Sequence, residues 1–182
     1  MVIFFLLALL ASVSKPLIIL LLTEKWLDSV IFLQIFCFAF MFEHISKLNL
    51  NLLQVKGRSD LYLRLEIIKK IIAFTILIMS IPYGMIVICL SKILNGQIAL
   101  FINTYYTGRL FQFGYLEQFK DFSKYLVYSL LACLPTYIFC LFDYSPSIQL
   151  FLGGIVAIVL YYCFIHKDDI FKELHQFIKI KK

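Results

Sequence analysis

Charged side chains are scarce in this sequence. Of its 182 residues, 15% are Asp, Glu, Lys or Arg and 62% are hydrophobic, and the mean hydropathy is +0.92. A soluble domain has about 25% charged and about 45–50% apolar residues. The shortage of charge excludes a disordered chain and a coiled coil, and it argues against a water-soluble single domain. It indicates an integral membrane protein.

The sequence also lacks the common signatures of enzymes, metal sites and disulfide-bonded domains. It contains no G-x-S-x-G, P-loop or H-E-x-x-H motif. Its five cysteines lie in apolar runs without C-x-x-C spacing, so they predict neither a disulfide framework nor a zinc site. We therefore expect a protein that is not an enzyme and that binds no metal or cofactor.

Long apolar runs fill most of the chain. A helix that crosses a bilayer needs about 20 mostly apolar residues. Six segments approach this length: 1–22, 29–53, 67–81, 84–105, 124–142 and 148–165. The sequence therefore predicts an all-α fold, a polytopic membrane helix bundle with about six transmembrane helices over residues 1–165. The third and fourth segments are joined by residues 81–84, which predicts a tight antiparallel hairpin.

Lys and Arg are distributed unevenly around these segments. They concentrate after the second, fourth and sixth segments, whereas Lys25 stands alone on the opposite side. Positive residues favour the cytoplasmic side of a membrane, so we expect both termini to be cytoplasmic. Because the basic residues are spread over separate loops, they do not indicate nucleic-acid binding. Residues 166–182 place apolar side chains at helical spacing among lysines, which predicts either an amphipathic cytoplasmic helix or a solvated basic tail.

Polar residues form a stripe along the second segment. Glu43 and Lys47 are four residues apart, so they can form an ion pair on one helix face, and Asn51 continues that face. Charges within a membrane segment are costly, and they usually face a cavity or a partner. Two interpretations stay open at this point. The stripe either lines a water-accessible cavity or is a self-neutralised pair that fixes helix packing.

A second polar face runs along the fourth segment. Lys92, Asn95 and Asn103 fall on one side of a helix, and Lys92 has no acidic residue three or four positions away. It therefore needs a partner from another helix, a cavity or an anionic ligand, which makes it a candidate substrate contact. Lys15 stands beside Pro16 in the first segment. A broken helix near a charge favours a midplane binding site, but a kink with a snorkelling lysine explains it equally well.

Four stretches carry a resemblance to a known family. They are LNLNLLQVKGRSD at residues 48–60, LYLRLEIIKK at 61–70, INTYYTGR at 102–109 with FGY at 113–115, and the segment 16–26 that ends in LLLTEKW. Together they resemble bacterial polysaccharide flippases that move O-antigen or oligosaccharide repeat units. These flippases belong to the multidrug/oligosaccharidyl-lipid/polysaccharide exporter superfamily.

The resemblance implies a function and a set of partners. Such transporters have two helix bundles and move undecaprenyl-diphosphate-linked sugars across the bacterial inner membrane by alternating access. The matching stretches belong to their C-terminal part, so the resemblance implies a fragment that works with membrane lipid and with a missing N-terminal half or a second copy. The cargo is an anionic, polar lipid-linked oligosaccharide. The expected lining of its cavity is the set of polar residues within the segments: Lys15, Glu43, Lys47, Asn51, Lys92, Asn95 and Asn103.

Two other functions stay open. A drug or cation antiporter of the same superfamily needs an unpaired acid in the membrane for ion coupling, and Glu43 is the only clear intramembrane acid. A non-transporting membrane partner of glycan-assembly enzymes is the other alternative. The short length favours such a partner, whereas the polar stripes favour a transporter.

Overall fold

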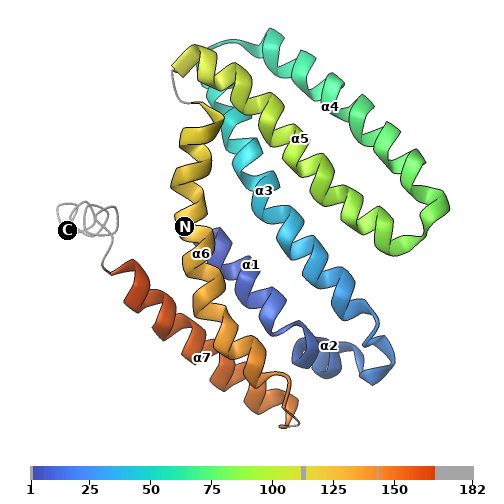
Figure 1. Ribbon diagram of the computed structural model, residues 1–182, viewed down its shortest axis with the longest axis vertical. Helices are drawn as coiled ribbons and strands as arrows, with labels where there is room; N and C mark the ends of the chain where they lie inside the picture. The colour runs from blue at the N-terminus through green and yellow to red at the C-terminus, as the bar shows by residue number, and fades with distance from the viewer. Residues whose placement is uncertain (1, 112–113, 143, 167–182) are drawn as a thin grey trace. The chain divides into compact units, whose positions relative to one another are not determined.

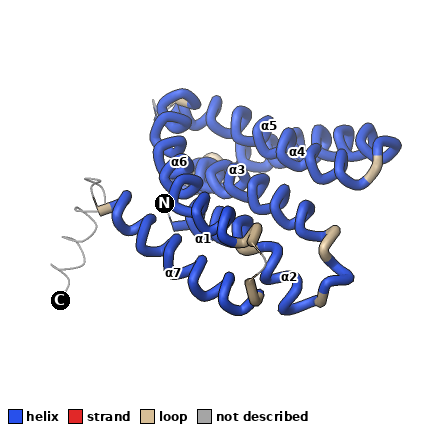
Figure 2. Tube along the Cα trace, turned by 60° about the horizontal axis from the view of Figure 1, so that its bottom comes forward, coloured by secondary structure: helices blue, strands red, loops and turns tan. Residues whose placement is uncertain are grey.

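The computed structural model of the protein describes residues 2–111, 114–142 and 144–166 (Figure 1). Within these ranges all the regular elements are helices, and no strand occurs (Figure 2). The predicted all-α fold is therefore confirmed. The predicted basic tail over 166–182 lies, apart from its first residue, outside the described residues.

Seven α-helices and two short 3-10 helices follow one another along the described part of the chain. In chain order they are α1 (Val2–Ser12), α2 (Ser14–Leu22), η1 (Glu24–Trp26), α3 (Ser29–Val55), α4 (Ser59–Ser80), η2 (Ile81–Tyr83), α5 (Met85–Phe111), α6 (Tyr115–Phe139) and α7 (Pro146–Ile165). The connections between the α-helices are short, so most of the described chain lies in a helix.

Four helices, α3, α5, α6 and α7, are long and apolar enough to cross a membrane, which makes this a membrane protein. The pair α1 and α2 bends by 65° and adds a fifth candidate if it is one broken span. The break falls at Val13, next to the interruption expected at Lys15 and Pro16. The remaining predicted span corresponds to α4, which has 22 residues but carries several charges in its first half. A sixth span therefore stays a prediction.

Contacts divide the chain into two compact units. Residues 28–123 form the unit that we call the central unit, which contains α3, α4, α5 and the first part of α6. Residues 1–27 and 124–182 form the terminal unit, which contains α1, α2, the rest of α6 and α7. This division follows contacts between helices, whereas the sequence suggested a bundle over 1–165 and a separate tail.

In the central unit, α3, α4 and α5 lie side by side (Figure 1). The chain leaves α3 through Gly57, whose φ of 71° suits glycine, and Gly57 N–H donates to the Gln54 carbonyl at 2.9 Å. Arg58 N–H donates to the Leu53 carbonyl at 3.1 Å, which completes a Schellman motif. The chain leaves α4 through η2 and Gly84, whose φ is 89°. This short turn confirms the predicted hairpin of the third and fourth segments.

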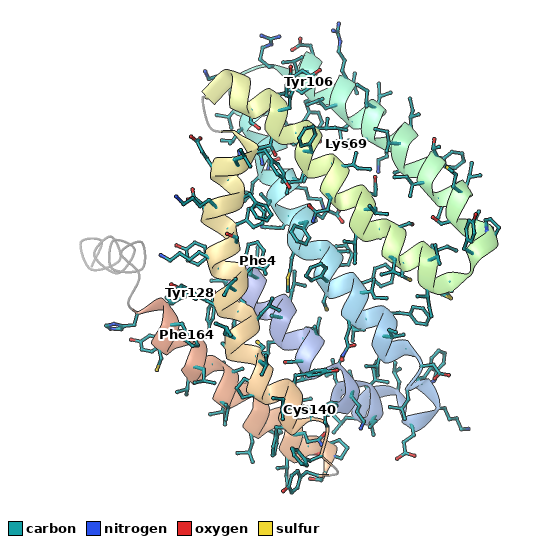
Figure 3. All side chains as sticks on the ribbon, in the orientation of Figure 1. Phe4, Lys69, Tyr106, Tyr128, Cys140 and Phe164 are labelled. Carbon is teal, nitrogen blue, oxygen red and sulfur yellow. The ribbon has the colours of Figure 1, made fainter. Side chains whose placement is uncertain are left out.

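In the terminal unit, α6 and α7 touch closely. The Thr136 hydroxyl donates to the Gly153 carbonyl at 2.8 Å, and a Cβ added to Gly153 would lie 2.7 Å from Thr136 Cγ2. Further along the same two helices, the rings of Tyr128 and Phe164 stack with centroids 5.9 Å apart (Figure 3). Gly153 therefore lies at the close contact between the two helices, whereas a Cβ added to Gly154 would have nothing within 4 Å.

These two glycines allow a matched test of the contact. Gly153→Ala should lower the melting temperature in detergent relative to Gly154→Ala, because its methyl group must displace Thr136. Overpacking of this kind costs about 1–3 kcal/mol. Both substitutions gain the same helix propensity, about 1 kcal/mol, so the difference between them isolates the collision. Equal melting temperatures by circular dichroism would show that α7 does not depend on this contact.

Candidate functional site

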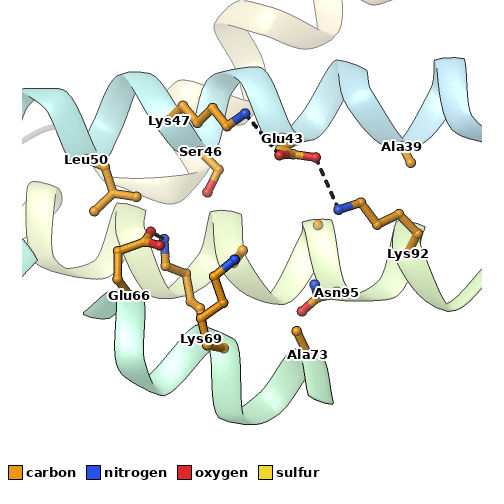
Figure 4. Close-up of a pocket in the computed structure, with 13 residues that line it drawn as sticks. Ala39, Glu43, Ser46, Lys47, Leu50, Glu66, Lys69, Ala73, Lys92 and Asn95 are labelled. Atoms are coloured by element: carbon orange, nitrogen blue, oxygen red, sulfur yellow. Dashed lines mark hydrogen bonds and ion pairs between the residues drawn. The ribbon is translucent and has the colours of Figure 1, made fainter. Parts of the chain in front are cut away.

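A cavity of about 290 Å³ lies between α3, α4 and α5 of the central unit (Figure 4). Each helix lines it with residues at the spacing i, i+3, i+4 and i+7, which is one face of an α-helix. Small side chains leave the space open, among them Ala39, Ala73 and Ala99 from the three helices in turn. The charged residues that line the cavity are Glu43, Lys47, Glu66, Lys69, Lys70 and Lys92.

Glu43 lies between two lysines from different helices. Lys47 Nζ, one turn further along α3, is 3.1 Å from Glu43 Oε1. Lys92 Nζ, on α5, is 3.4 Å from Glu43 Oε2, as the dashed lines in Figure 4 show. The predicted pair on α3 is therefore confirmed. The expectation that Lys92 needs a partner from elsewhere is also confirmed, since that partner is Glu43.

Lys92 has a second neighbour besides the carboxylate. Its Nζ lies 6.0 Å from the centroid of the Phe40 ring, at the outer limit of a cation–π contact. The Lys92 side chain nevertheless remains 41% exposed. The ammonium group is therefore held at the edge of the cavity by one carboxylate and one ring, and it stays accessible to a ligand.

The α4 side of the cavity has an ion pair of its own. Glu66 pairs with Lys69, three residues later on the same helix, and only 12% of the Lys69 side chain is exposed. Lys70 follows directly and also lines the cavity, but none of the ion pairs among the described residues includes it. The cavity thus holds four lysines against two glutamates. Lys47 and Lys70 are exposed, so the excess positive charge of the cavity is accessible to an anion.

The other predicted site residues fall in different places. Asn95 lines the cavity beside Lys92, whereas Asn51 is exposed and does not. Asn103 is fully buried and donates to Ser46, at 3.0 Å to the carbonyl and 2.7 Å to the hydroxyl, so it links α5 to α3. Lys15 lies in α2 of the terminal unit and is half-buried.

Three charged residues of the cavity, Glu66, Lys69 and Lys70, were not predicted as site residues from the sequence. Lys69 and Lys70 counted there only among the basic residues that follow the second segment. Their spacing of three and four residues from Glu66 places all three on one helix face, which is the signal that would have identified them. The pattern alone does not show that this face turns towards α3 and α5.

A buried polar cluster lies beyond the cavity, towards the C-terminal end of α3. Asn49 and Gln118 exchange two amide hydrogen bonds, of 2.8 Å and 2.9 Å, between α3 and the start of α6. The Thr107 hydroxyl of α5 donates to Asn49 Oδ1 at 3.0 Å. All three side chains are buried. Because these polar groups satisfy one another, the cluster fixes three helices in register and has little capacity to bind a ligand.

Metal ligands do not gather anywhere in the described ranges, where no group of three or more His, Cys, Asp or Glu could hold an ion. Comparison of the chain with protein-family models, with curated proteins and with solved structures found no match. The cavity and its charges are therefore the observations on which a function can be proposed.

Asn49 and Asn51 provide a matched pair for testing the buried cluster. Asn49→Ala should destabilise the protein by about 1–3 kcal/mol, because it removes two buried amide hydrogen bonds with Gln118. Asn51→Ala changes an exposed residue on the same helix and should have little effect. Thermal unfolding in detergent measures both. Equal stability of the two variants would contradict the assigned role of Asn49.

Proposed function

We propose that the chain is part of a flippase that moves lipid-linked oligosaccharides, and that its central unit binds the phosphate groups of the cargo. The observation that carries this proposal is the cavity between α3, α4 and α5, with its four lysines and two glutamates. Phosphate is a dianion with several strong acceptor oxygens, and lysine ammonium groups bind it as point charges. The resemblance of four stretches of the sequence to polysaccharide flippases leads to the same cargo.

The size of the cavity limits what it can hold. Its volume of about 290 Å³ is at the lower end of the range for small-molecule sites, about 300–1,000 Å³. It therefore suits the phosphate part of a lipid-linked sugar and leaves the glycan and the lipid tail outside. Ser46 and Asn95 add a hydroxyl and an amide to the lining, which can bind phosphate oxygens or a first hydroxyl group.

The pairing of Glu43 favours this function over cation-coupled antiport. A coupling acid has to exchange its proton or sodium ion freely from the membrane interior. Both carboxylate oxygens of Glu43 face an ammonium group, at 3.1 Å and 3.4 Å. A cation therefore meets two positive charges at this residue, whereas an anion meets two groups that attract it.

The wider setting belongs to the same proposal. The chain works in the bacterial inner membrane as a multi-pass protein with both termini in the cytoplasm. It acts together with a second bundle, either a missing N-terminal half or a second copy of the chain. Support for the orientation comes from the concentration of Lys and Arg after the second, fourth and sixth segments.

Binding to the cavity can be tested with inorganic pyrophosphate, the soluble counterpart of a lipid diphosphate. The Lys92→Gln variant should bind it about tenfold more weakly than the unmodified protein, because one charge-assisted contact is lost. Lys120→Gln is the control, since Lys120 is exposed on α6 and does not line the cavity. Isothermal titration calorimetry on purified protein gives both affinities. A failure of the unmodified protein to bind pyrophosphate would overturn the proposed site.

Transport can be tested in a bacterium that carries the gene. Replacing both Lys47 and Lys92 with Gln should reduce surface glycan strongly while the protein level stays normal, since the cavity loses half of its lysines. The amount of surface polysaccharide and a quantitative blot measure the two quantities. Unchanged surface glycan in the double variant would contradict a role in export.

A further inference from the structure

Glu43 occupies the position in the cavity that an anionic ligand would take. Its carboxylate joins Lys47 of α3 to Lys92 of α5, so it links two of the three helices that form the cavity. We infer that Glu43 is a displaceable internal counter-ion: a phosphate-type dianion replaces it on Lys92, while Glu43 keeps its contact with Lys47. This inference rests on the proposed function, because it concerns how the same cavity accepts its ligand.

The contact between Glu43 and Lys92 is loose. Its 3.4 Å length exceeds the about 2.7–2.9 Å of a strong charge-assisted hydrogen bond. Glu43 Oε2 is buried, yet it has no hydrogen-bond partner among the described residues. A phosphate group offers three acceptor oxygens where the carboxylate offers one weakly engaged atom. Lys92 can therefore exchange the carboxylate for a stronger acceptor.

Glu66 forms a contrasting ion pair in the same cavity. It pairs with Lys69 on its own helix, and that lysine is almost fully covered. Breaking this pair would leave a buried ammonium group without compensation, which is costly. Lys92, in contrast, is 41% exposed and gains a ligand when it leaves Glu43. The two glutamates thus carry the same charge but have different roles.

The charges that face Glu43 determine what happens to its carboxylate when a ligand binds. Lys47 and Lys92 contact it directly, and the α4 residues Glu66, Lys69 and Lys70 line the same space. A dianion that takes over Lys92 leaves Glu43 its shorter contact, the 3.1 Å ion pair with Lys47.

Glu43 and the dianion therefore compete for Lys92. Removing the charge of Glu43 should raise the affinity of the cavity for a dianion, because Lys92 then has no carboxylate to exchange. The ligand is assigned by its chemistry as a phosphate-type dianion, whether on a lipid headgroup or free in solution.

The experiment measures sulfate binding to the purified full chain by calorimetry at neutral pH, where sulfate is a dianion. Glu43→Gln should bind sulfate about fivefold or more tightly than the unmodified protein, because Lys92 no longer pairs with a carboxylate. Glu66→Gln is the matched control. It removes the same charge from the same cavity but keeps the contact between Glu43 and Lys92, so its affinity should rise clearly less.

The outcomes separate this inference from the proposed function. An affinity of Glu43→Gln no higher than that of the unmodified protein would overturn the inference. Glu43→Asp is the second variant if Glu43→Gln does not fold, because its shorter side chain also loosens the contact with Lys92 and should raise the affinity. Equal effects of Glu43→Gln and Glu66→Gln would also overturn the inference, because the effect would then follow total charge. In both cases sulfate binding itself would still support the proposed site. Absence of sulfate and pyrophosphate binding would overturn the site and the inference together.

A second arm identifies the source of the phosphate group. Short-chain phosphatidic acid is compared with inorganic phosphate, and short-chain phosphatidylcholine serves as the lipid control. Tighter binding of phosphatidic acid than of both other probes assigns the site to a lipid headgroup. Equal binding of phosphatidic acid and inorganic phosphate assigns it to the anion alone. In both cases Glu43→Gln should increase the affinity for the bound probe.

Discussion

The structure of the central unit depends on how it compensates charge among apolar helices. A charged side chain that leaves water needs an opposite charge or a polar partner, and removing one member of such a pair is strongly destabilising. Glu43 meets this need for Lys47 and Lys92 at once. Glu43 therefore links α3 to α5 at the cavity, in addition to the hydrogen bonds from Asn103 to Ser46, and it reduces the positive charge that a ligand encounters.

Two polar layers follow each other along α3, and they differ in how fully their groups are satisfied. In the layer around Asn49, the side chains of Gln118 and Thr107 complete a closed set of hydrogen bonds. In the layer around Glu43, one carboxylate oxygen lacks a hydrogen bond and the lysines exceed the glutamates. The first layer holds the helices together, and the second can change partners without releasing them.

Periodicity within one helix predicted much of this arrangement. The spacing of Glu43 and Lys47 gave their ion pair, and the isolation of Lys92 indicated a partner on another helix. Asn51 was expected beside them, but it points outward, whereas Asn49 forms the buried cluster. Helical spacing tells which residues share a face. Packing between helices decides which faces meet. Small residues at the contact, such as Gly96, carry no charge, so the charge pattern of the sequence does not reveal this contact.

The charge balance of the cavity separates a binding role from a purely structural one. If the polar residues served only to hold α3, α4 and α5 together, one carboxylate for each lysine would suffice, and a further exposed lysine would contribute little to packing. Lys70 lines the cavity in addition to the paired lysines, and the small side chains around it keep the space open. An uncompensated positive charge is useful when it attracts an anion that comes and goes. Helices that only pack together gain nothing from it, so the excess charge itself argues for a ligand.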